Sequence, residues 1–208
     1  MKGVKKASIV VGAVAAFAGS AQAASIPAGP YVGIVGGYEI TTLKYSASSG
    51  ASSTEVDSLA LKGLRAGAIL GWGAWGNDIY GALEVNGAMS FADGDVSTNG
   101  DKLNLESKET YGASLLFGHR VVPGALLYGR VGLQRMKATA SSGGASDNEW
   151  FNGIRAGVGG MWALSDVVTF RLEYTHGFYE SEKSNVGGST VKLDPRENIF
   201  QAGFTVGF

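Results

Sequence analysis

The sequence predicts an all-β fold, an eight-stranded antiparallel transmembrane β-barrel with an up-and-down meander topology. The first observation behind this prediction is at the C-terminus, where every second residue is apolar: Phe200, Ala202, Phe204, Val206 and Phe208. Side chains alternate across the pleat of a strand, so this pattern gives one face to lipid and one face to a polar lumen. The other two observations are an N-terminal export sequence and an alternation of short and long connections between similar segments.

The N-terminus has the three parts of a secretory signal peptide. Lys2, Lys5 and Lys6 precede an apolar run that begins at Ile9 and ends near Gly19, and the small-x-small sequence of residues 21–23 follows. The run is too short to cross about 30 Å of hydrocarbon as a helix. We therefore expect residues 1–23 to be a cleaved signal peptide and residues 24–208 to be the barrel domain.

Eight segments with a period of two can be laid out along the mature chain. They are residues 31–43, 60–74, 79–91, 107–119, 125–138, 149–162, 167–179 and 190–208. A tilted strand needs about 9–11 residues to span the bilayer, so each segment is long enough and some should project beyond it.

The connections between these segments alternate in length. Residues 75–78, 120–124 and 163–166 form tight turns, whereas the connections near 44–59, 92–106, 139–148 and 180–189 are longer and rich in Ser, Gly, Ala and acidic residues. Short periplasmic turns and long outer loops are typical of outer-membrane barrels. Residues 99–100, Asn-Gly, indicate a hairpin tip in the second long connection.

Outward-facing aromatic residues fall at two levels, as in the girdles of a membrane barrel. The periplasmic level is predicted to hold Trp72, Phe117, Trp162 and Phe208, and the outer level Tyr38, Phe91, Tyr111, Trp150 and Phe178. A soluble β-sandwich also alternates polar and apolar residues, but it has no reason to place aromatic residues in two rings on one face.

The same alternation places nearly all of the charged residues in the middle of the strands on the inward face. The expected lumen charge network is Glu39, Arg65, Glu84, Arg130, Arg155, Arg171 and Glu173. Eight strands enclose a space that side chains can fill, and unpaired buried charges are costly, so these groups should pair. Two interpretations remain open: a structural polar core, or a narrow pore gated by exchange of Arg–Glu partners.

Composition excludes several function classes. The chain has no cysteine, and therefore no disulfide, thiolate metal site or lipoprotein anchor. Loss of Lys2, Lys5 and Lys6 leaves 14 of the 17 Lys and Arg residues against 18 Asp and Glu, a net charge of −4 that argues against nucleic acid as a partner. We expect no cofactor and no metal site, although Asp93, Asp95 and Asp101 leave open a weak divalent bridge to lipopolysaccharide.

Catalysis is not predicted either. A lipid-modifying esterase needs a histidine with a nearby serine and a carboxylate on the lipid face. The only histidines are His119 and His176, and no such set can be assembled around either of them. An outer-leaflet enzyme is thus the least favoured function, behind a structural surface protein whose exposed loops bind partners and a narrow channel for small solutes.

Several short segments resemble one family of bacterial envelope proteins. They are residues 31–33, 66–68, 71–72, 80–84, 170–175 and 203–208. On these residues the chain resembles the small outer-membrane β-barrel proteins of the OmpA, OmpX and opacity type, and most closely the alphaproteobacterial surface antigens described as porin-family proteins. The chain departs from the family in its Gly-Phe ending, and it lacks the periplasmic peptidoglycan-binding domain of full-length OmpA.

The resemblance implies a monomer in the outer membrane, in contact with lipid and lipopolysaccharide. It also implies that the barrel-assembly machinery reads the last strand as an assembly signal, carried here by Phe204, Val206 and Phe208. Any ligand or host receptor would be bound by the loops.

Overall fold

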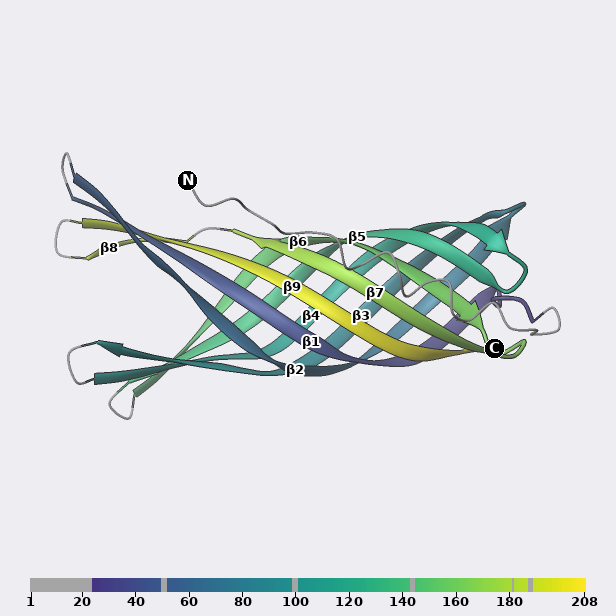
Figure 1. The fold of residues 1–208 in the computed structure, drawn as a ribbon, viewed down its shortest axis with the longest axis horizontal. Coiled ribbons are helices and arrows are strands. Elements are labelled where there is room, and N and C mark those ends of the chain that lie inside the picture. The colour runs from purple at the N-terminus through teal and green to yellow at the C-terminus, as the bar shows by residue number, and fades with distance from the viewer. Residues whose placement is uncertain (1–23, 50–51, 99–100, 143–144, 181, 187–188) are drawn as a thin grey trace, which may run out of the picture.

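A computed structural model describes residues 24–49, 52–98, 101–142, 145–180, 182–186 and 189–208, which form one antiparallel sheet closed into a barrel (Figure 1). Its strands are β1 (Gly29–Ser49), β2 (Ser52–Gly76), β3 (Ile79–Thr98), β4 (Asp101–Val122), β5 (Ala125–Ser142), β6 (Ala145–Ala163), β7 (Val168–Tyr179), β8 (Glu182–Val186) and β9 (Ser189–Gly207). The predicted signal peptide, residues 1–23, lies outside the described residues. Across the described ranges, no helix is long and apolar enough to cross a membrane.

The wall of the barrel has eight positions, because β7 and β8 share one of them. Both strands pair with β9, β7 as far as Phe178 opposite Arg196 and β8 from Glu182 opposite Leu193. Pro195 lies in the stretch of β9 between these pairs and has no N–H to donate to a ladder, which accounts for a break there. Every other strand pairs with its sequence neighbours, and β9 closes the sheet on β1. The predicted eight-stranded meander is confirmed.

The register of the strands fixes the tilt and width of the barrel. Hydrogen-bonded partners can be followed around the wall from Tyr31 until they return to β1 at Thr41, ten positions further along the strand. With about 3.3 Å per residue and about 4.8 Å between strands, this shear tilts the strands by about 40° from the barrel axis. Such a barrel is narrow enough for side chains to fill it.

The two faces of the wall divide as the alternation predicts. The residues expected to face lipid are exposed or half-buried on the outside, and the intervening residues are mostly buried inside. Aromatic pairs lie at both levels of the outer surface: Phe170 lies 5.4 Å from Phe204 near the periplasmic end, and Tyr111 lies 6.2 Å from Trp150 near the outer end (ring centroids).

The periplasmic connections are tight turns, as predicted. Asn77 has a φ of 56° in the turn between β2 and β3, a conformation that asparagine tolerates well. Pro123 and Gly124, the latter with a φ of 78°, turn the chain between β4 and β5.

The long outer connections that the sequence predicts are built mainly from extensions of the strands. Most residues of the four long connections continue the strands as hairpins, and β1 and β2 remain paired as far as Ser49 opposite Ser52. Strand pairing satisfies every backbone donor and acceptor between neighbours, whatever the side chains, so a composition rich in Ser, Gly and Ala does not end a ladder.

Candidate functional site: the charged lumen

The lumen holds all seven residues that the sequence analysis assigned to it, each no more than 4% exposed. An eighth, Glu197 on β9, is completely buried and belongs with them. The sequence analysis missed Glu197 because it followed the C-terminal alternation only back to Ile199, although one further step of two residues along the same strand reaches Glu197. With Glu197, the buried charges among the described side chains are four arginines and four glutamates, which balance.

These eight side chains form two groups. The periplasmic quartet consists of Glu84 on β3, Arg130 on β5, and Arg171 and Glu173 on β7. The outer quartet consists of Glu39 on β1, Arg65 on β2, Arg155 on β6 and Glu197 on β9. Each of the seven ion pairs that the structure describes in the lumen stays within one quartet, and each quartet is neutral by itself.

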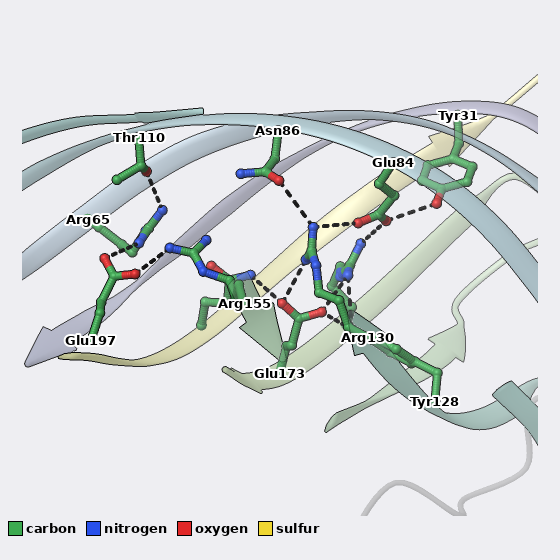
Figure 2. A network of polar contacts seen from close by, with 12 residues as sticks. Tyr31, Arg65, Glu84, Asn86, Thr110, Tyr128, Arg130, Arg155, Glu173 and Glu197 are labelled. Carbon is green, nitrogen blue, oxygen red and sulfur yellow. Dashed lines mark hydrogen bonds and ion pairs between the residues drawn. The ribbon is translucent and has the colours of Figure 1, made fainter. Parts of the chain in front are cut away.

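In the periplasmic quartet each arginine contacts both glutamates (Figure 2). Arg130 Nη1 lies 2.8 Å from Glu173 Oε1, and Arg130 Nη2 lies 3.1 Å from Glu84 Oε2 as an ion pair without hydrogen-bond geometry. Arg171 donates to Glu84 at 2.5 Å and to Glu173 at 2.8 Å. Because β3 and β7 lie on opposite sides of the eight-membered ring, the Glu84–Arg171 pair braces the barrel across its diameter.

Neutral polar side chains complete the periplasmic quartet. Tyr31 donates to Glu84 at 2.8 Å, and Tyr128 and Gln201 each donate to Glu173 at 2.7 Å. The Tyr31 ring crosses directly over Gly71, where a Cβ would lie 2.5 Å from the tyrosine oxygen. A glycine is required at that position for the tyrosine to reach Glu84.

The outer quartet is centred on Glu197 (Figure 2). This carboxylate accepts from Arg155 at 2.5 Å and from Tyr179 at 2.8 Å, and it lies 3.4 Å from Arg65 Nη1. Arg65 also contacts Glu39 at 3.3 Å and donates to Thr110 at 2.9 Å. Arg65 and Arg155 come from opposite sides of the ring, so this quartet also links distant parts of the wall.

The N-terminal segment, residues 24–28, lies at the periplasmic end of the barrel (Figure 1). Ile26 is 5% exposed and belongs to an apolar cluster of inward-facing side chains at the base of the lumen. The Ile26 carbonyl accepts a hydrogen bond from Trp75 Nε1 at 2.9 Å, and a Cβ at Gly124 would lie 2.7 Å from the Ala24 carbonyl oxygen. The charged residues of the lumen therefore lie between this apolar base and a second apolar cluster toward the outer end, which consists of Met136, Phe151 and Tyr179.

The sequence analysis expected a charge network in the lumen and did not describe this apolar cluster. It contains Ile26, Tyr31, Tyr80, Ala82, Leu116, Leu126, Tyr128, Met161 and Ala163. All but Ile26 have inward positions at the periplasmic ends of strands, so the alternation could have located them. Nothing in the sequence of residues 24–28 indicates that Ile26 enters the lumen.

On the outer surface, one polar cluster lies among the apolar residues. Tyr174 donates to Asn198 Oδ1 at 2.8 Å, and His176 Nδ1 lies 2.8 Å from the same oxygen. His176 contacts the Phe178 ring edge-on, and His119 is exposed near the periplasmic end. In the residues that the structure describes, no group of three or more His, Cys, Asp or Glu is placed to hold a metal ion. The side chains of Asp93, Asp95 and Asp101 lie outside that part.

Comparison with known proteins identifies the family. The model of the outer membrane protein beta-barrel domain matches residues 9–208. The chain belongs to this family. It is a protein of the bacterial outer membrane, as the alternating pattern and the resemblance predicted.

Two solved structures share the fold. Neisserial surface protein A (NspA) is 18% identical, with a TM-score of 0.52 over 87% of this chain and 98% of that chain. OprG from Pseudomonas aeruginosa is 14% identical, with a TM-score of 0.50 over 90% of this chain and all of that chain. No curated protein sequence matches the chain.

Removing one charge from a quartet should destabilise the barrel strongly. Glu84→Gln leaves Arg130 and Arg171 with one carboxylate, and losing one partner of a buried ion pair costs about 3–5 kcal/mol. Urea unfolding in lipid vesicles should show this loss, while Glu180→Gln, at the exposed residue that follows β7, should change stability by less than about 0.5 kcal/mol. Equal effects of the two substitutions would show that the quartet does not hold the wall together.

The N-terminal segment can be tested by thiol labelling, because the chain has no cysteine of its own. In the folded protein, Ile26→Cys should react with a membrane-impermeant maleimide at least tenfold more slowly than Ala28→Cys, which is exposed. Adding Trp75→Phe to Ile26→Cys removes the donor to the Ile26 carbonyl and should speed labelling. Similar rates at positions 26 and 28 would mean that the segment does not occupy the mouth.

Proposed function

We propose that this protein is a monomeric structural surface protein, which supports the integrity of the outer membrane and presents its outer hairpins for interaction. The observation that carries the proposal is the filled lumen. Both quartets cross-link strands from opposite sides of the ring, and Ile26 closes the base. An interior arranged in this way supports rigidity of the wall rather than passage of solutes.

A narrow channel for small solutes is the second candidate. The Nε–H groups of Arg65, Arg130, Arg155 and Arg171 have no hydrogen-bond partner among the described residues. Buried polar groups of this kind usually bind water, and a hydrated lumen whose arginines exchange partners could conduct. The two candidates differ in one measurable quantity, the conductance of the purified protein in a planar bilayer.

We assign no enzymatic activity. A hydrolytic triad needs a nucleophile beside its histidine. The residues that the structure places against His176 are Asn198 and Phe178, and neither is a nucleophile. An outer-leaflet lipid-modifying enzyme would change the mass of lipid A in cells that overproduce the protein. We expect that mass to stay the same.

Deletion of the gene should increase the sensitivity of cells to detergent and vancomycin, and the purified protein should show no conductance. Both the wild type and Glu180→Gln should restore resistance, whereas Glu84→Gln should restore it poorly because the wall is less stable. Conductance in the wild type that Glu84→Gln increases would favour the channel instead.

Tags near Ser48 should be detected on intact cells, and a tag at Asn77 only after permeabilisation.

We also propose that residues 1–23 are removed on export and that the last strand directs assembly. Phe204 and Val206 lie on the lipid face of β9, and Phe208, which follows the strand at its periplasmic end, continues their row and is 75% exposed. The barrel-assembly machinery would bind this row before the strand pairs with β1. Lipid and lipopolysaccharide would surround the finished barrel.

Deletion of Phe208 should leave export intact but cause unfolded protein to accumulate in the periplasm, whereas Phe208→Tyr should assemble normally because tyrosine is also tolerated at the interface. A charge on the lipid face costs about 2–4 kcal/mol at the bilayer midplane and little near the rim. Phe204→Lys should thus lower the stability of refolded protein more than Phe208→Lys. Heat-modifiable folded protein at normal levels in outer membranes of the Phe208 deletion strain would contradict the proposed signal.

A further inference from the structure

An apolar groove lies on the outer wall of the barrel, in the half that faces the periplasm. Its volume is about 720 Å³, and its lining comes from neighbouring positions on β2, β3, β4 and β5. Trp72, Leu83 and Phe117 stand around it, and each of these side chains is more than half exposed. Large side chains that project from the wall form the sides of the groove, and small residues between them form its floor.

Three small residues form this floor beside the Phe117 ring. Gly81 of β3 and Gly129 of β5 pair with Phe117 from its two sides. Ala74 of β2 pairs with Gly81 and extends the floor by one more strand. An aromatic ring that is flanked by glycine on both sides leaves space for a narrow apolar chain to lie against the wall.

The fold itself does not require these two glycines. Neither has a positive φ, and a Cβ at Gly81 would meet no atom within 4 Å, while one at Gly129 would lie 4.0 Å from the Gly157 carbonyl oxygen. By contrast, a Cβ at the inward-facing Gly67 or Gly132 would come within 3 Å of the neighbouring strand. Glycine weakens a strand, and inside a strand it often marks a place where another molecule approaches closely. Its use at two open positions therefore indicates such an approach.

A pair of opposite charges lies at the periplasmic rim beside the groove. Arg120 Nε lies 3.9 Å from Asp78 Oδ1, and the Arg120 N–H donates to the Asp78 carbonyl, which holds the two residues side by side. The guanidinium also covers the Trp75 ring, 4.4 Å from its centroid. The two charged side chains are 40% and 66% exposed. An exposed pair of this kind is weak, so each charge is available to a second partner.

The spacing between the groove and the charged pair matches the dimensions of one bilayer leaflet. Asp78 and Arg120 lie three residues beyond Gly81 and Phe117 on the same two chain segments, about 10 Å along the strands and about 8 Å along the barrel axis. The headgroup layer on each side of a bilayer is about 5–8 Å thick. A lipid chain beside Phe117 therefore brings its headgroup to the level of the pair, and His119 is exposed on the outer face between the two levels.

We propose that the groove binds one acyl chain of a phospholipid from the periplasmic leaflet, and that its headgroup is zwitterionic, with the phosphate at Arg120 and the ammonium at Asp78. Arginine pairs well with phosphate oxygens. The carboxylate attracts an ammonium group and repels a headgroup that carries only negative charge. Burial of the chain supplies affinity, and the charged pair selects the headgroup.

The proposal rests on the family membership and on the orientation of the barrel. The tags near Ser48 and at Asn77 test that orientation separately. The lipid site does not depend on the proposed surface role, so the envelope phenotype of the deletion strain and the retention of lipid can succeed or fail independently.

The lipid test uses the full mature protein in vesicles of phosphatidylethanolamine and phosphatidylglycerol, in equal amounts and with identical chains. After extraction with mild detergent, native mass spectrometry should show one retained phospholipid, with phosphatidylethanolamine favoured at least fivefold. Equal retention of the two lipids would indicate a shell of unselected lipid and overturn the proposal. A preference for phosphatidylglycerol, or retention of neither lipid, would overturn it as well.

Matched variants locate the acyl chain. The double variant Gly81→Leu, Gly129→Leu fills the groove from its floor, where a Cβ has space, and should lower the retained phosphatidylethanolamine at least tenfold. Gly36→Leu is the control, because Gly36 is also exposed on the outer wall and its Cβ would lie 3.9 Å from the nearest atom. It should change retention less than twofold, and heat-modifiable migration shows that each variant is folded. Retention by the double variant at the level of the wild type would contradict the proposed site.

Exposed positions at the rim test the headgroup without altering the groove. Asp78→Asn should reduce the preference for phosphatidylethanolamine to less than twofold, and Arg120→Gln should lower the retention of both lipids. Asp166→Asn, an exposed residue of another periplasmic turn, should change neither quantity. A preference that survives Asp78→Asn would overturn the proposal. So would a lipid-free dimer that the variant Gly81→Leu, Gly129→Leu abolishes, because a second copy of the chain would then occupy the groove.

Discussion

Closure of eight strands with a shear of ten creates a space that must be filled from within, and ion pairing is the interaction that makes this filling possible. Four arginines and four glutamates lie in a lumen where an unpaired charge would be strongly unfavourable. Their division into two neutral quartets lets each level of the barrel satisfy its own charges. The apolar base, the polar partners and the glycine beneath Tyr31 are all placed around these pairs.

The quartets also explain how a thin wall becomes rigid. Backbone ladders join only neighbouring strands, and they leave the cross-section of a small barrel free to flatten. Contacts across the diameter, such as Glu84 with Arg171, oppose that deformation directly. The contribution of such a pair to the net free energy of folding can be small, yet it selects one shape among several with the same ladders.

Much of this structure could be predicted from the alternation of apolar and other residues along each strand. The alternation around Phe208 gave the correct face to every lipid-exposed residue named from the sequence, because the pleat leaves no freedom once one position is known. The same rule reaches Glu197, so that omission was avoidable. The outer hairpins were not predictable from composition, because ladder pairing can hold residues such as Ser and Gly in strands. Which arginine meets which glutamate also required the structure, since register and tilt decide it.

The position of Ile26 at the base of the lumen has a consequence for the order of events in folding. The cluster that surrounds it is assembled from β1, β3, β4, β5 and β6, and Trp75 of β2 holds its carbonyl. Until those strands have come together there is no pocket for the isoleucine to enter. The first residues of the described chain can therefore take up their final position only after these six strands have come together.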